Sequence, residues 1–153
     1  MEVVQAVELT EADIYNLSLI VTAKSAAGAY QEFERLLTLY GKWGLSGCMP
    51  KALECPGTRG QRSFAITDNM MLYIEQCVCA LREKLSERPD LWLAFRLQYL
   101  TVQYGEQYEK VRQKYRKALH EQQRVYSVRT RQRDAAAFVK RLHKGIKEML
   151  LKM

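Results

Sequence analysis

Residues 127–151, SVRTRQRDAAAFVKRLHKGIKEMLL, decide the fold because they carry the strongest periodic pattern in the chain. The positions of this pattern step by four and three, the spacing that places side chains on one face of an α-helix. Ser127 precedes the pattern and is a favourable N-cap residue. The pattern predicts a long helix, packed through Val128, Gln132, Ala135, Val139, Leu142, Ile146 and Met149.

The remaining positions of this segment are strongly basic. We expect one side of the helix to pack on the protein and the other to face a polyanion. The basic residues away from the apolar stripe are Arg129, Arg133, Lys140, Lys144 and Lys147, with Arg131 and Arg141 flanking them.

The positive charge of the protein is concentrated in its C-terminal third. The net charge is +7, yet residues 104–153 hold fourteen Lys and Arg against five Asp and Glu. Residues 1–103 hold ten basic and twelve acidic side chains. This asymmetry favours a polyanionic partner that meets one end of the molecule. The alternative is a pair of lysine-rich helices that are merely solvated.

A second helix is predicted just before the long one. Residues 106–120 have Tyr108, Val111, Tyr115 and Leu119 at helical spacing, and the polar residues 122–126 indicate a turn. Two helices joined by a turn, the second opening with three arginines, are typical of a helix-turn-helix DNA reader. Arginine can bond O6 and N7 of guanine together, and lysines farther along would meet phosphates. The candidate DNA-binding residues are Ser127, Arg129, Thr130, Arg131, Arg133, Lys140, Arg141 and Lys144.

The rest of the chain predicts more helices and one long loop. Thr10 with Asp13 has the pattern of a helix N-terminus, a cap is offered by Thr67, and Pro89 can open a further helix. A helical pattern through Tyr30, Phe33, Leu36, Leu37 and Tyr40 is expected to end at residues 41–44. A glycine- and proline-rich loop then spans residues 45–64. We therefore expect one all-α domain of 153 residues, with residues 104–153 as its basic helix-turn-helix region.

Metal, membrane and catalytic functions have little support. Cys48, Cys55, Cys77 and Cys79 lack the paired spacing of a zinc ribbon, so reduced thiols are the simpler reading and a four-cysteine metal site the alternative. No apolar run is long enough to cross a bilayer, and residues 1–5 do not resemble an export signal, so a cytoplasmic location is expected.

His120 and His143 are far apart and in basic surroundings, so both are expected on the surface. We expect no catalysis and no cofactor.

Three short elements follow one another in a fixed order between residues 36 and 150. The first is Tyr40-Gly41-Lys42-Trp43-Gly44, and the second is Ala65-Ile66-Thr67-Asp68 with apolar residues at Leu72, Ile74 and Val78. The third runs from Pro89 through Leu97-Gln98-Tyr99-Leu100. In order and spacing they resemble the phage antitermination Q proteins, which also end in a helix-turn-helix. The stretch 105–126 is longer and more charged than its counterpart there, and the turn glycine is absent.

The resemblance implies a sigma-region-like helix-turn-helix and a role in late gene expression. Such a factor binds duplex DNA that overlaps a phage late promoter, loads onto host RNA polymerase paused with its sigma factor, and makes it pass terminators. Only the last helix can be matched, with Arg129, Arg131, Arg133 and Lys140 as DNA contacts. The polymerase-contacting surface cannot be matched in this way, and we assign it to the long loop from Trp43 to Arg62, with Trp43, Lys51, Arg59 and Arg62 as its contacts. The expected location is the nucleoid of a bacterial host, and a second copy on the DNA is left open.

Two other functions remain open at this point. One is a repressor or activator that binds DNA through the same helices and does not travel with polymerase. The other is a basic helical module that binds an acidic protein surface. The first would leave polymerase sensitive to terminators, unlike an antiterminator. The second would bind duplexes weakly and without selectivity.

Overall fold

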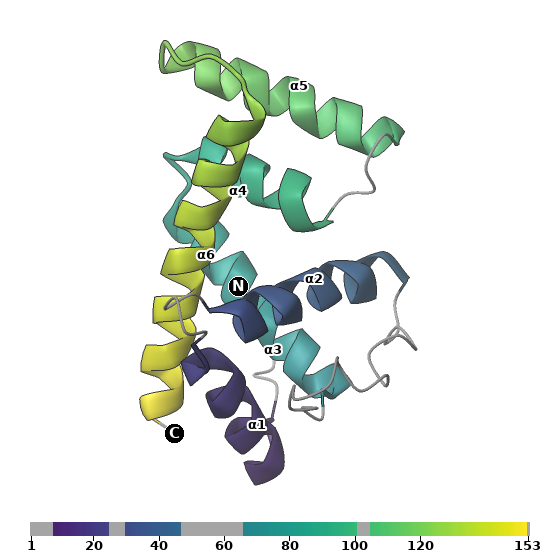
Figure 1. Ribbon diagram of the computed structural model, residues 1–153, viewed down its shortest axis with the longest axis vertical. Coiled ribbons are helices and arrows are strands. Elements are labelled where there is room, and N and C mark those ends of the chain that lie inside the picture. Colours follow the sequence, from purple (N-terminus) through teal and green to yellow (C-terminus); the bar gives the residue numbers. More distant parts are fainter. Residues whose placement is uncertain (1–7, 25–29, 47–65, 101–104, 153) are drawn as a thin grey trace, which may run out of the picture.

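The computed structural model describes residues 8–24, 30–46, 66–100 and 105–152. This part of the chain is built from helices and has no β-strand, which confirms the predicted all-α class. Helix α6 runs along one side of the molecule, with α1, α2 and α3 beside its C-terminal half and α4 and α5 near its N-terminal half (Figure 1). The elements are α1 (Glu11–Thr22), α2 (Gln31–Ser46), α3 (Asp68–Lys84), α4 (Pro89–Phe95), the π-helical η2 (Arg96–Leu100), α5 (Glu106–Glu121) and α6 (Val128–Leu151).

The helix starts predicted at Thr10, Thr67 and Pro89 are confirmed. Thr10 and Asp13 form a capping box, in which each backbone N–H donates to the other residue's side chain. Thr67 accepts a hydrogen bond from the N–H of Met70, and its hydroxyl donates to Asp13 Oδ1 at 3.0 Å. Pro89 occupies the first turn of α4. The caps therefore also join the start of α3 to the start of α1.

Helix α2 continues past the point where the sequence predicted its end. It runs through Gly41 and Gly44 to Ser46, so the first two residues of the predicted loop are helical. The remainder of that loop lies outside the described residues. Gly41 faces η2, and a Cβ at this position would overlap the carbonyl oxygen of Tyr99. A glycine inside a helix costs about 1 kcal/mol, and here its small size allows two backbones to approach closely.

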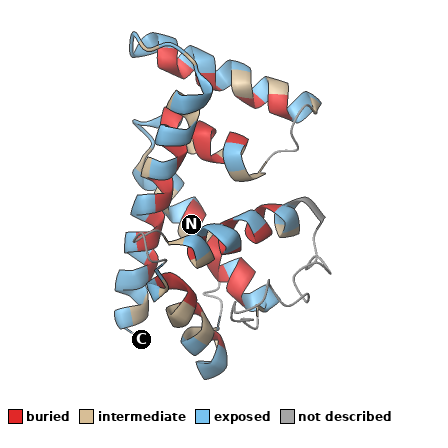
Figure 2. Cartoon of the chain, in the orientation of Figure 1, coloured by how far each residue is buried: buried red, intermediate tan, exposed pale blue. Residues whose placement is uncertain are grey.

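Two apolar clusters form the core, and α4 and α6 contribute to both. Leu91 and Phe95 of α4 belong to the larger cluster with residues of α1, α2 and α3, whereas Leu93 and Leu97 face α5. Phe95 stacks on Phe138 of α6 with ring centroids 4.5 Å apart. Buried residues accordingly line the sides of α4 and α6 that face their neighbours (Figure 2). The paired helices α4 and α6 therefore connect the two halves of the molecule.

The buried stripe of α6 differs at its ends from the predicted one. Ala135, Val139, Leu142 and Ile146 are buried as expected. Val128 and Met149 are about half exposed, and Gln132 is exposed. The first and last turns of α6 are therefore less completely covered by neighbouring elements than its middle. No helix in the described ranges is long and apolar enough to cross a membrane.

Candidate nucleic-acid interface

The turn predicted between the last two helices is present at residues 122–127. The N–H groups of Gln122 and Arg124 both donate to the carbonyl of Leu119, and that of Gln123 donates to His120. Gln123 has φ 58°, the left-handed conformation in which glycine is usual. Gln123 therefore takes, within this turn, a backbone conformation that glycine adopts at lower cost.

Replacing Gln123 by glycine is expected to stabilise the protein by about 1 kcal/mol, because glycine adopts positive φ without the steric cost of a side chain. The measurement is the free energy of unfolding from urea denaturation. Gln113→Gly is the matched control: Gln113 is exposed inside α5, and glycine there should destabilise by about 1 kcal/mol. Equal losses of stability in both variants would contradict the assigned turn.

Ser127 caps α6, as the sequence predicted. Its Oγ accepts a hydrogen bond from the N–H of Thr130 at 3.0 Å, and the two hydroxyls are 2.9 Å apart. Both candidate hydroxyls are therefore engaged with one another at the helix start. Their clearest role is to fix the beginning of α6.

Five basic side chains of α6 form what we call the cationic stripe: Arg129, Arg133, Lys140, Lys144 and Lys147. All five are exposed, and their steps of four, seven, four and three residues place them along one side of the helix. None forms a salt bridge with another residue of the described part of the chain. The stripe extends over about 27 Å at the rise of an α-helix.

Arg131 and Arg141, two other predicted DNA contacts, lie away from this stripe. Arg131 is half-buried, and its Nη1 donates to the hydroxyls of Tyr108 at 2.6 Å and Tyr126 at 3.4 Å. Arg141 donates to the carbonyl of Ala137 and lines a groove between α6 and α3. The structure thus brings Arg129, Arg133, Lys140 and Lys144 together and separates Arg131 and Arg141 from them.

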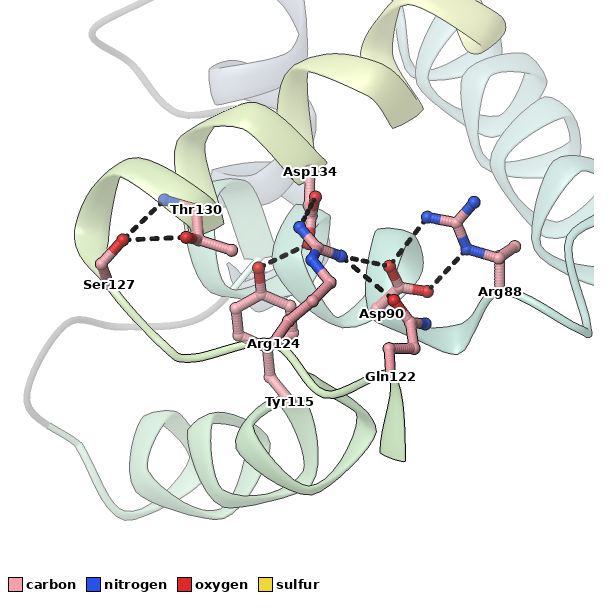
Figure 3. Close-up of polar contacts among 8 residues, drawn as sticks. All are labelled: Arg88, Asp90, Tyr115, Gln122, Arg124, Ser127, Thr130 and Asp134. Carbon is pink, nitrogen blue, oxygen red and sulfur yellow. Dashed lines mark hydrogen bonds and ion pairs between the residues drawn. The ribbon is translucent and has the colours of Figure 1, made fainter. Parts of the chain in front are cut away.

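A network of ion pairs that the sequence analysis missed holds the turn against α4 and α6 (Figure 3). Arg124 donates to Asp90 Oδ2 at 3.2 Å and to Asp134 Oδ1 at 2.9 Å. Asp90 also accepts two hydrogen bonds from Arg88, and Asp134 accepts one from the hydroxyl of Tyr115 at 2.7 Å. One guanidinium group therefore connects α4, the turn and α6, and Tyr115 adds α5.

Burial and these partners shift the pKa values of several members of the network, among them Asp90 and Tyr115. Burial raises the pKa of Asp90, but hydrogen bonds from Arg88 and Gln122 outweigh it and hold this pKa below its ordinary value. Burial, and then the neighbouring Asp134, raise the pKa of Tyr115.

One sequence signal could have revealed the network. Asp134 is the single acidic residue in the first half of a basic helix, and it stands directly beside a position of the apolar stripe.

His143 does not lie on the surface, contrary to the sequence-based expectation, whereas His120 is exposed as expected. The Nε2 of His143 donates to the carbonyl of Val21 at 2.6 Å, and its ring lies 3.9 Å from that of Tyr30 between centroids. The expectation failed because α1, Tyr30 and Phe33 of α2 cover this side of α6. His143 therefore joins α1 to α6.

Trp43 lies in α2 rather than in a loop. Its Nε1 donates to Asp68 Oδ1 at 3.1 Å, and its ring stacks on that of Tyr40. Lys51, Arg59 and Arg62, the other predicted polymerase contacts, lie outside the described residues. This Trp43 contact fixes the end of α2 against the start of α3.

Two of the four cysteines fall within the described ranges. Cys77 and Cys79 of α3 are free thiols, and burial raises the pKa of both. Cys48 and Cys55 lie outside those ranges. No group of three His, Cys, Asp or Glu side chains in the described segments could hold a metal ion.

Comparison of the chain with protein-family models, with curated proteins and with solved structures finds no significant match. A functional proposal therefore rests on the geometry of α5, the turn and α6. The part with the clearest chemical character is the cationic stripe, a row of exposed positive charges on a helix that is fixed in the core on its other side.

Proposed function

We propose that this protein is a DNA-binding transcription factor whose reading helix is α6. The cationic stripe is the observation that carries the proposal. Its regular placement on one helix suits a rod-shaped polyanion. Phosphates recur at regular intervals along a duplex, so several cations arranged in a line can each contact one of them. The opposite side of α6 packs in both core clusters, which would hold the stripe in place on the DNA.

The arrangement of the last two helices supports a helix-turn-helix as the reading unit. Helix α5 runs across the N-terminal end of α6 (Figure 1). The turn is longer than the three or four residues of the usual motif, but Arg124 and its two carboxylate partners stiffen it. Arg131, bound to Tyr108, adds a link between the two helices.

The members of the stripe are assigned different roles in this proposal. Arg129 and Arg133 lie in the first two turns of α6, the part of a recognition helix that contacts base edges. Lys140 and Lys144 lie farther along and would contact phosphates. Arg131 acts as a positioning residue for α5 rather than as a base contact, because its guanidinium group is already bound to two tyrosines.

The fuller proposal is that the factor is a transcription antiterminator. Its support is the resemblance of three short elements to the phage antitermination Q proteins. The protein would then bind DNA at a late promoter, load onto RNA polymerase with its sigma factor, and let the enzyme read through terminators. Lys51, Arg59 and Arg62 are proposed to meet polymerase. Transcription through a terminator, with and without the protein, distinguishes this role from that of a repressor or activator.

Single substitutions in α6 test the assigned roles. Arg133→Ala should weaken binding to a specific duplex by about 1–3 kcal/mol and relax base preference, whereas Lys144→Ala should weaken all duplexes alike. Arg141→Ala is the matched control, because Arg141 lies off the stripe and should leave affinity nearly unchanged. The measurement is duplex affinity by fluorescence anisotropy. Equal affinities for all three variants would show that the stripe does not contact DNA.

One observation favours a protein partner as the alternative. A groove of about 500 Å³ between α3 and α6 has a mostly apolar lining, and its charged residues are three cations, Lys84, Arg141 and Lys152, and one anion, Glu148. Such a groove suits an acidic amphipathic helix. A module of this kind would bind specific and scrambled duplexes equally and weakly, so a comparison of the two duplexes separates the alternatives.

A further inference from the structure

A second hollow, of about 380 Å³, lies between the start of α2, η2 and α6. Its volume is within the range of pockets that bind small molecules. Residues from three separate segments line it, so the packing of the core fixes its shape. The lining residues that matter here are Tyr30, Gln98, Tyr99, Gln132, Ala136 and Lys140.

Packed aromatic rings form part of the wall of this pocket. Tyr30 lies against the ring of His143, which is itself held by its hydrogen bond to Val21. Tyr99 packs on Phe95 with ring centroids 5.2 Å apart. Lys24 Nζ also lies over the ring of Tyr30, 5.3 Å from its centroid, so the ring of Tyr99, held by Phe95, is the flat wall that remains for a planar ligand. Stacking on such rings binds any of the bases.

Polar groups at the pocket resemble those that read base edges. Gln98 and Gln132 both line it, are both exposed and carry amides that donate and accept hydrogen bonds. Lys140 also lines it and adds a positive charge. Glu34 lines the pocket too, and its carboxylate can accept a hydrogen bond from the amino group of a base such as adenine. An aromatic wall, amides, a carboxylate and one cation together match a nucleotide, which has a ring, polar ring edges and a phosphate.

The pocket adjoins the cationic stripe. Lys140 belongs to both, and Ala136 lies on the same side of α6, three residues after Arg133 and four before Lys140. DNA bound along the stripe would therefore pass the mouth of the pocket. A base turned out of the duplex could enter while its phosphate stays near Lys140.

We infer that this pocket receives one unpaired base of the bound DNA, an inference that rests on the proposed DNA-binding function. Turning a paired base out of a duplex costs a few kcal/mol, and the cost is smallest for a base that has no partner. The protein should therefore prefer duplexes that already carry an unpaired base. Such bases occur where a duplex has begun to open.

The test compares three kinds of duplex with one sequence. One is fully paired, one carries an extrahelical adenine placed in turn at successive positions, and one carries an abasic nucleotide at the same positions. The wild-type protein should bind the best adenine duplex about tenfold more tightly than the other two. The abasic duplex shares the backbone distortion, so only the base explains a difference.

Ala136→Leu places a larger side chain at the mouth of the pocket and should abolish the preference for the unpaired adenine. Because Ala136 also lies on the stripe side of α6, the readout is the ratio of the affinities for the adenine duplex and the paired duplex. Gln98→Ala removes a pocket amide in η2, away from the stripe, and should lower the same ratio while binding to the paired duplex remains. Ala12→Leu, at an exposed position of α1, is the matched control and should keep the preference. Circular dichroism checks that all three variants are folded.

The outcomes separate the pocket from the proposed function. Equal wild-type affinity for all three duplexes, or a preference that survives in Ala136→Leu, overturns the pocket and leaves DNA binding intact. Failure of the wild-type protein to bind any of the duplexes overturns the proposed function, and the pocket with it.

Discussion

Replacing Leu142 by aspartate is expected to unfold the protein, because it places an ionised carboxylate in the larger apolar cluster. Leu142 is 2% exposed, and its neighbours one turn away on α6 are Phe138 and Ile146, both fully buried. Loss of the leucine contacts alone costs about 2–5 kcal/mol, and burial of an unpaired charge adds to this. The sum approaches the whole stability of a typical domain, about 5–15 kcal/mol. Far-ultraviolet circular dichroism during urea titration measures the loss.

Lys144→Asp is the matched control for this substitution. It introduces the same carboxylate two residues later, on the exposed side of the same helix. Its effect on the free energy of unfolding should stay within about 0.5 kcal/mol. Similar urea midpoints for the two variants would show that the packed and exposed sides of α6 are assigned wrongly.

Replacing Arg124 by methionine is expected to destabilise the protein by about 3 kcal/mol, since the substitution removes one partner of a buried ion-pair network. Asp90 is fully buried and would keep only Arg88 and Gln122, and Asp134 would keep only the hydroxyl of Tyr115. Methionine preserves much of the side-chain volume, so the loss reports the missing charge. The measurement is again the free energy of unfolding in urea.

Arg129→Met is the matched control for the network, because Arg129 is exposed and forms no salt bridge to a described residue. It should leave the stability within about 0.5 kcal/mol of the wild type. The same small effect at Arg124 would show that the network contributes little to folding. The account of a stiffened turn would then fail.

The network also predicts how stability depends on acid. The pKa of Asp90 is lower in the folded protein than its ordinary value of 3.8, so the carboxylate stabilises the fold fully above that value. This contribution disappears as the pH falls through the folded-state pKa. Asp90→Asn cannot titrate at this position. Its unfolding free energy should therefore fall less steeply below about pH 4 than that of the wild type. Parallel pH profiles would contradict this assignment.

The sequence predicted those parts of the fold that depend on neighbouring residues. Caps at Thr10, Thr67 and Ser127 act within three residues of themselves, so the helix starts could be read directly. Gly41 was misread as a helix end because its partner is the backbone of Tyr99, far away along the chain. His143 was misplaced for the same reason, since its partner is Val21.

The candidate site was predictable to a similar degree. Periodicity identified the stripe, because exposure on a helix follows from position within the turn. It could not predict that Arg131 is half-buried, because this depends on the hydroxyls of Tyr108 and Tyr126 to which its guanidinium group donates. Nor could periodicity identify Arg124, which lies in the turn and whose structural role depends on its ion pairs with Asp90 and Asp134. Charge pattern indicates where cations are, and packing decides which of them remain available.

The central claim is that α6 reads DNA, and competition binding tests it most directly. The protein is titrated with a duplex taken from beside its own gene and with a scrambled duplex of the same length and composition, near physiological salt. If α6 reads DNA, the protein should prefer the first duplex by about a thousandfold, in the range of specific binders, and Arg133→Ala should reduce this preference. Equal, salt-sensitive affinity for both duplexes would contradict the claim and leave α6 as a cationic surface for an acidic partner.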